Sequence, residues 1–62
     1  MYQKYVELRE KNKTTDYKVS KGAGVTKSTF SDWKTGRSIP KLDKLQKLAD
    51  YFGVPITYFL EG

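Results

Sequence analysis

The stretch GVTKSTFSDWKTGRSIP, from Gly24 to Pro40, combines two large aromatic residues with an otherwise polar run. Phe30 and Trp33 lie three residues apart, which is the spacing that places two side chains on one face of a helix. The other face carries lysine, serine and threonine, which a helix built only to fill a core does not need. We therefore predict a helix from Lys27 to about Lys34 that buries its aromatic pair and presents a polar face outward. Thr26 is its expected N-cap, and Gly36 is expected to end it.

The residues before this stretch predict a second short helix, joined to the first by a tight turn. Thr15 is a suitable N-cap, and Asp16 lies where the helix dipole favours a carboxylate. We expect this helix from Asp16 to about Lys21, followed by a reversal at Gly24. Its inward side chains are small, which allows a close and steep crossing: Val19, Ser20 and Ala23. Residues 15–35 thus have the pattern of a helix-turn-helix, in which the second helix enters the major groove of DNA.

Three further helices are predicted around this pair. An amphipathic helix is expected from Tyr2 to about Asn12, and a short last helix is expected to start at Pro55. Between them, a leucine-rich helix is expected to bury one apolar stripe in the core: Leu42, Leu45, Leu48, Ala49 and Phe52. The sequence shows no repeat, linker or sustained strand alternation, so we predict an all-α fold in which residues 1–62 form one compact five-helix domain.

The composition restricts the possible functions. Twelve Lys and Arg residues against seven Asp and Glu residues give a net charge of +5, which suits a nucleic-acid partner. The chain contains no Cys and no His, so no nucleophile–base pair or metal cluster is visible, and we expect no enzyme activity, no cofactor and no small-molecule substrate. No apolar run approaches the roughly 18 residues of a membrane span, and MYQKYVELREKN lacks the hydrophobic region of a signal peptide. We therefore expect a cytoplasmic protein with no membrane partner.

From Tyr5 to Leu60 the chain resembles the lambda-repressor-like, Cro/CI-type (XRE family) helix-turn-helix DNA-binding domains of phage and prophage repressors. The resemblance lies in ELREKN, in Thr15 opening the second helix, in GVTKSTFSDWKTGRSIP and in LDKLQKLADYFGVPITYFL. It implies sequence-specific binding to double-stranded DNA and transcriptional regulation, with repression as the expected mode. Because such domains act in pairs, it also implies a homodimer on a two-fold symmetric operator.

The resemblance also assigns candidate site residues. The positions that face base edges are Lys27, Ser28, Thr29, Ser31 and Asp32. The positions that contact phosphates are Thr15, Lys18, Lys34, Thr35, Arg37, Ser38 and Lys41. Their chemistry agrees with these roles, since lysine donates to guanine and aspartate accepts from cytosine, while basic and hydroxyl side chains bind the phosphates of the DNA backbone. The exposed candidates for self-pairing are Ile56, Tyr58 and Phe59, and core filling is their alternative role.

Two departures from the family pattern bear on affinity and stability. Asp16 stands where the family commonly has Gln, and a carboxylate repels phosphate, so Thr15, backbone amides or Lys18 are expected to serve instead. Ala23 stands where a Leu is usual, which thins the core under the turn. We expect Arg9 to pair with a carboxylate. The alternative function is a protein-interaction module, antitoxin-like or an adaptor, and it is supported by two acidic residues, Asp16 and Asp32 in the centre of the outward face. The alternative role of residues 27–29 is that of an ordinary exposed first turn.

Overall fold

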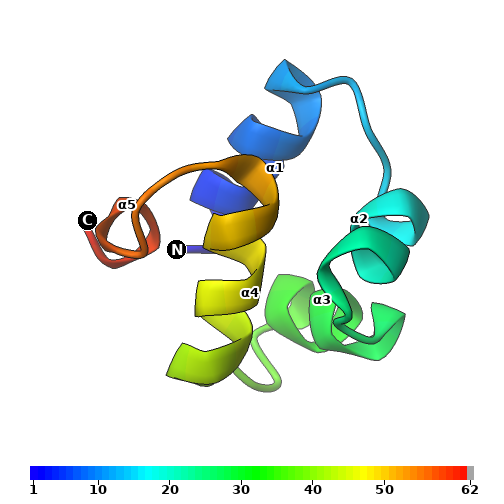
Figure 1. Cartoon of the computed structure of the whole chain (residues 1–62). Helices are drawn as coiled ribbons and strands as arrows, with labels where there is room; N and C mark the ends of the chain where they lie inside the picture. The colour runs from blue at the N-terminus through cyan, green and yellow to red at the C-terminus, as the bar shows by residue number, and fades with distance from the viewer. Residues whose placement is uncertain (62) are drawn as a thin grey trace.

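The computed structural model describes residues 1–61 of the chain, and its ribbon is shown in Figure 1. The elements in order are α1 (Tyr2–Lys11), α2 (Asp16–Ala23), α3 (Lys27–Thr35), α4 (Leu42–Phe52) and α5 (Thr57–Leu60). The described residues contain no strand, and the all-α prediction is confirmed. Helices α2 and α3 lie on one side of the molecule and α5 on the other, with α4 between them (Figure 1).

The helix ends follow the local signals in the sequence. The Thr15 hydroxyl accepts a hydrogen bond from the Lys18 backbone N–H at 3.2 Å, so Thr15 caps α2 as predicted. Gly24 and Gly36 end α2 and α3 in the left-handed region, with φ of 74° and 79°. The last helix differs from the prediction, because Pro55 lies in the turn before α5. Its carbonyl accepts from the Tyr58 N–H at 2.9 Å.

Aromatic rings from three helices form the centre of the core. The Tyr5 ring stacks on Phe30, with centroids 4.7 Å apart and planes 10° apart, and on Trp33 at 5.6 Å. Trp33 in turn lies 6.2 Å from the ring of Phe59. Leucine, valine and alanine side chains complete the buried set: Leu8, Val19, Val25, Leu45, Leu48 and Ala49. Offset ring pairs stabilise a core beyond the area that they bury, which matters in so small a domain.

The prediction about Leu42 is wrong, and that about Phe59 is decided by packing. Leu42 was expected inside, but 63% of its surface is exposed. It is the first residue of α4, and helical side chains lean toward the N-terminus, so Leu42 reaches past the core that Leu45 enters. Phe59 was a candidate for an exposed self-pairing surface, with core filling as its alternative role, and only 1% of it is exposed because it packs against Trp33. Core filling is therefore the role of Phe59, whereas Phe52 is partly buried at the edge of the core.

Helices α2 and α4 pack closely where Gly22 faces Tyr51. A Cβ atom on Gly22 would lie 2.2 Å from Cε1 of Tyr51, so this glycine makes room for the ring. The cost of a glycine inside a helix, about 1 kcal/mol relative to alanine, therefore has a structural reason. Within residues 1–61, no helix is both long and apolar enough to cross a membrane.

Candidate nucleic-acid interface

Helix α3 separates an aromatic face from a polar one. Phe30 and Trp33 are 1% and 4% exposed and lie against Tyr5. The five residues that the sequence assigned to base edges all belong to α3, on its remaining surface. Lys27, Ser28 and Ser31 are exposed, while Thr29 and Asp32 are half-buried. The outer surface of α3 therefore offers hydroxyl, ammonium and carboxylate groups to a partner.

The turn between α2 and α3 is fixed by Ser20 and Val25. The Ser20 hydroxyl donates to the Val25 carbonyl, and the Val25 N–H donates back to the Ser20 carbonyl at 3.2 Å. Val25 itself is buried, and Gly24 supplies the left-handed residue that the reversal needs. These contacts set the angle between the two helices, so the outer surface of α3 is presented in one orientation.

A hydroxyl cluster, consisting of Thr26, Ser28 and Thr29, lies at the start of α3. The Thr26 hydroxyl is 3.1 Å from the hydroxyls of both Ser28 and Thr29. Thr26 occupies the N-cap position in its backbone, as predicted, but its side chain makes no hydrogen bond to a backbone N–H. Each of these hydroxyls both donates and accepts, so the cluster orients groups that suit base edges or phosphates.

The chain after α3 folds back against the end of that helix. The Asp32 carbonyl accepts from the Arg37 N–H at 2.8 Å, from the Ser38 N–H at 3.3 Å and from the Thr35 hydroxyl at 3.2 Å. The residues predicted to contact phosphates here are all exposed: Lys34, Thr35, Arg37, Ser38 and Lys41. Among residues 1–61 only Arg9 makes ion pairs, so these cations are free of carboxylate partners.

The Asp16 carboxylate contacts α1, so it is not directed at a DNA phosphate, which its position in the family pattern implies. It accepts from Nη1 of Arg9 at 3.0 Å and from the Tyr5 hydroxyl. The hydrogen bond to Asp16 raises the pKa of Arg9, and burial together with the same carboxylate raises the pKa of Tyr5. The expected carboxylate partner of Arg9 is thus Asp16. Because its charge is paired, Asp16 is not a free repulsive group beside a phosphate.

Comparison with known proteins agrees with this geometry. The helix-turn-helix family (HTH_3) matches residues 7–59, from α1 to α5. The chain belongs to this helix-turn-helix family. It is also 38% identical, over 50 residues, to the cryptic phage CTXphi transcriptional repressor RstR of Vibrio cholerae. That alignment covers 81% of this chain and 45% of the relative, so the chain spans about half the length of the repressor. No solved structure matches.

Family membership confirms the resemblance to Cro/CI-type domains that the sequence indicated. The family is one of DNA-binding regulators and not of enzymes.

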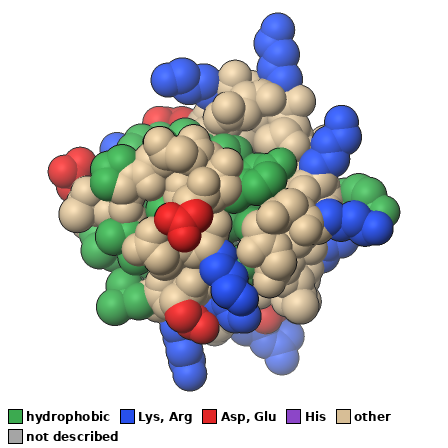
Figure 2. All heavy atoms as spheres, viewed as in Figure 1, with side chains coloured by type: hydrophobic (Ala, Val, Ile, Leu, Met, Phe, Trp, Pro, Cys, Tyr) green, Lys and Arg blue, Asp and Glu red, His purple; other side chains and the backbone are tan. Residues whose placement is uncertain are grey.

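Lys and Arg side chains are distributed unevenly over the surface of this helix-turn-helix domain. Figure 2 shows Lys and Arg side chains projecting from the side where α2 and α3 lie, as well as at the top and bottom of the view. Hydrophobic side chains gather on the opposite side, over α5 (Figure 2).

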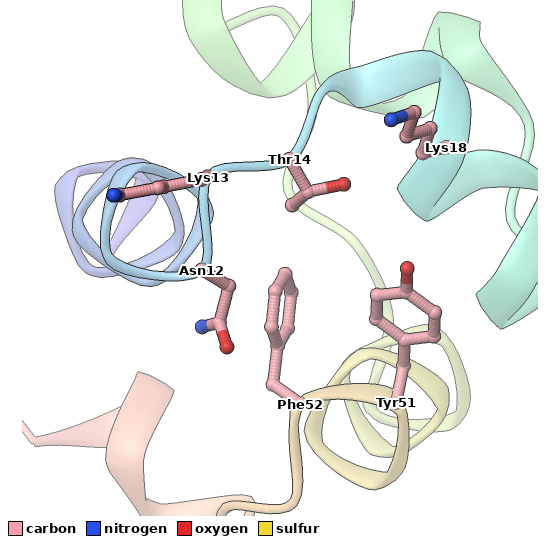
Figure 3. A pocket seen from close by; sticks show the side chains of 6 residues that line it. All are labelled: Asn12, Lys13, Thr14, Lys18, Tyr51 and Phe52. Carbon is pink, nitrogen blue, oxygen red and sulfur yellow. The ribbon is translucent and has the colours of Figure 1, made fainter.

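The two flanks of α2 carry different side chains. Lys18, a predicted phosphate contact, lines a hollow of about 480 Å³ with Thr14 of the α1–α2 connection and Tyr51 and Phe52 of α4. In Figure 3 the Thr14 hydroxyl, the Lys18 ammonium and the Tyr51 hydroxyl come toward the same space, while the Lys13 ammonium points away. Lys18 therefore belongs to the flank of α2 that faces α4.

Tyr17 occupies the flank of α2 that faces α3, and sequence reasoning missed it. The residue is 54% exposed, and the Nζ atoms of Lys21 and Lys27 lie 5.2 and 5.8 Å from the centroid of its ring. The spacing of Tyr17 and Lys21, one helical turn, was visible in the sequence. The approach of Lys27 depends on the crossing of two helices and was not visible.

Proposed function

We propose that this protein is a sequence-specific, double-stranded DNA-binding transcriptional regulator, and that it acts as a phage- or prophage-type repressor with α3 in the major groove. One observation carries the proposal. The polar surface of α3 stands directly over a buried aromatic pair, within a helix-turn-helix whose turn is fixed. In this motif the second helix is the one that reaches base edges. The similarity to a phage repressor supports the regulatory role.

The base-reading set in this proposal is the one on the outer surface of α3. Ser28 and Thr29 offer hydroxyls that donate or accept, and Ser31 lies one turn further along. Asp32 accepts from the amino group of cytosine if the helix enters deeply enough. Lys27 stands at the edge of the set, where a long cationic side chain reaches either guanine or a phosphate.

Backbone contacts are assigned to the end of α3 and the segment that follows it. Lys34, Arg37 and Lys41 supply positive charge, while Thr35 and Ser38 supply hydroxyls. These contacts set the register of the domain on DNA without reading sequence. Thr15 and Lys18 complete the proposed set at the start of α2, where the Thr15 hydroxyl is already engaged as a cap.

A helix of nine residues covers few base pairs, so we propose that two copies bind a two-fold symmetric operator. Ile56 and Tyr58 are the proposed self-pairing residues, and both are partly buried against the core of their own domain. The protein-interaction alternative loses one of its two supports, because the charge of Asp16 is paired with Arg9 inside the domain.

Selection from random duplex DNA, followed by sequencing, tests the proposal. Two variants then make the same chemical change at different positions. Ser28→Ala should relax base preference at one position of each half-site, worth about 1–3 kcal/mol. Ser38→Ala should weaken all sequences alike and keep the preference. Selection that enriches no sequence would contradict sequence-specific binding. If Ser28→Ala and Lys27→Ala both leave the base preference unchanged, α3 is not the reading helix.

A further inference from the structure

Tyr17 connects the two helices of the helix-turn-helix through their lysines. Lys21 lies one turn further along α2, and Lys27 is the first residue of α3. Both ammonium groups lie within 6 Å of the centre of the Tyr17 ring, which is the range of a cation–π interaction. These three residues form the Tyr17 cluster.

The Tyr17 cluster is positively charged and has no counterion among residues 1–61. In the part of the chain that the structure describes, neither lysine lies within ion-pair distance of a carboxylate. The Tyr17 hydroxyl likewise makes no hydrogen bond to any of residues 1–61. Two ammonium groups on one exposed ring repel each other, and a ligand with negative charge would remove that repulsion.

We propose that the Tyr17 cluster binds one phosphate of the DNA backbone, and that Tyr17 is the residue that positions Lys27 at this phosphate. The inference rests on the proposed function and deepens it, since it moves Lys27 from the base-reading set to the backbone. The ring attracts both ammonium groups and keeps them on the α2–α3 edge. The phenolic hydroxyl adds a donor that suits a phosphate oxygen.

The alternative is that the lysine stems merely cover an exposed ring, as long side chains do on many helices. The two explanations differ in their effect on DNA. A covering role changes solubility or stability slightly, whereas a phosphate site changes the salt dependence of binding. Because Tyr17 is more than half exposed and is not one of the buried core residues, replacing its ring leaves the core packing intact.

The experiment compares the salt dependence of duplex binding for the unmodified protein, Tyr17→Phe, Tyr17→Ala, Lys21→Ala and Lys27→Ala, with Lys47→Ala as the control. Lys47 is an exposed lysine of α4, so this control removes the same charge at a distance from the Tyr17 cluster. Each lost phosphate contact lowers the log–log salt slope by about 0.9, which is about eightfold in affinity at 0.1 M relative to 1 M salt. Lys21→Ala and Lys27→Ala should show this loss, and Lys47→Ala should not.

The positioning role of Tyr17 predicts a separate result, which base preference and double variants measure. Lys27→Ala should weaken binding to every single-base variant alike, and its effect should shrink when Tyr17→Ala is already present. Tyr17→Phe keeps the ring, so it should retain the unmodified salt slope and lose only the hydroxyl contact. Thermal melts of all variants should coincide with that of the unmodified protein.

Three outcomes separate the proposals. If the unmodified protein binds no duplex even at low salt, the proposed function fails and the phosphate site fails with it. If the unmodified protein binds with a steep salt slope but Lys21→Ala and Tyr17→Ala behave like Lys47→Ala, only the phosphate site is wrong. If Lys27→Ala relaxes preference at one base pair, Lys27 reads a base and Tyr17 does not hold it at the backbone.

Discussion

Helices α3 and α4 share an amphipathic plan but have different outer surfaces. The inner face of α3 is aromatic, with Phe30 and Trp33, whereas α4 buries leucine and alanine. On α4 the Gln46 side chain donates to the Asp50 carboxylate at 2.8 Å, and two lysines balance two aspartates: Lys44, Lys47, Asp43 and Asp50. On α3 two lysines stand against one aspartate: Lys27, Lys34 and Asp32. Among residues 1–61 no lysine of either helix makes an ion pair, so the two helices differ in charge balance.

The difference between the outer surfaces of α3 and α4 indicates which of the two helices binds a partner. The amphipathic pattern tells which face of each helix is buried, and it does so equally well for α3 and α4. It does not tell which outer surface binds a partner. That distinction comes from the balance of charge on the outer surface, because a surface with as many aspartates as lysines attracts DNA less than one with an excess of lysines.

The largest expected effect is a loss of stability when the buried face of α3 is changed. Trp33→Ala removes a ring that contacts Tyr2, Tyr5 and Phe59, and a change of this kind costs on the order of 3–5 kcal/mol. In a 62-residue domain this loss should abolish cooperative folding at room temperature. Circular dichroism during thermal and urea denaturation measures it. Cooperative melting near the midpoint of the unmodified protein would show that Trp33 does not anchor α3.

A second prediction compares two aspartates, one from each part of the molecule. Asp16→Ala leaves the Tyr5 hydroxyl and Arg9 without their partner and should cost about 1–2 kcal/mol, since the carboxylate is only partly exposed. Asp50→Ala removes an exposed contact on α4 and should stay within about 0.5 kcal/mol. Urea denaturation of both variants gives the comparison. Equal costs would mean that the Arg9–Asp16 pair does not hold α2 against α1.

The sequence was sufficient for the elements that local chemistry determines. Thr15, Gly24 and Gly36 marked the ends of α2 and α3 correctly, because caps and left-handed residues act within one turn of the chain. The aromatic spacing of α3 likewise indicated its buried face. The outward residues of α3 remain predictions as DNA contacts, although the exposure of Lys27, Ser28 and Ser31 agrees with that role.

Tertiary packing decided the features that the sequence could not show. Leu42 continues the apolar stripe of α4, but that stripe extends one turn beyond the partners available to it. Phe59 is as apolar as any surface anchor, and only the space beside Trp33 makes it a core residue. The place of Tyr17 beside Lys27 depends on the crossing of α2 and α3, which no spacing within one helix encodes.

The third prediction compares one cation from each outer surface. Arg37→Ala removes a proposed phosphate contact after α3 and should lower the salt slope by about one unit, with nearly uniform weakening across sequences. Lys47→Ala removes the same charge from α4 and should leave the slope unchanged. Fluorescence anisotropy titrations at several salt concentrations measure both. Identical slopes for the two variants would show that binding responds only to net charge.

The smallest effect concerns the contact between α2 and α4. Gly22→Ala gains helix propensity worth about 1 kcal/mol, but the new Cβ must displace the Tyr51 ring. We expect little or no gain in the unmodified protein and a gain of about 1 kcal/mol when Tyr51→Ala is already present. A double-mutant cycle by urea denaturation isolates the coupling. If the gain is the same in both backgrounds, Gly22 is not needed to seat Tyr51.

The difference between α3 and α4 is tested most directly by NMR titration of the labelled protein with a selected duplex. Amide shifts report, residue by residue, which outer surface meets DNA. We predict that the largest changes lie in residues 15–21, in α3 and in the segment through Lys41, and that the exposed positions of α4 beyond Lys44 change little. Shifts concentrated on α4 and α5, with α3 unaffected, would contradict the assignment of α3 as the DNA-binding helix.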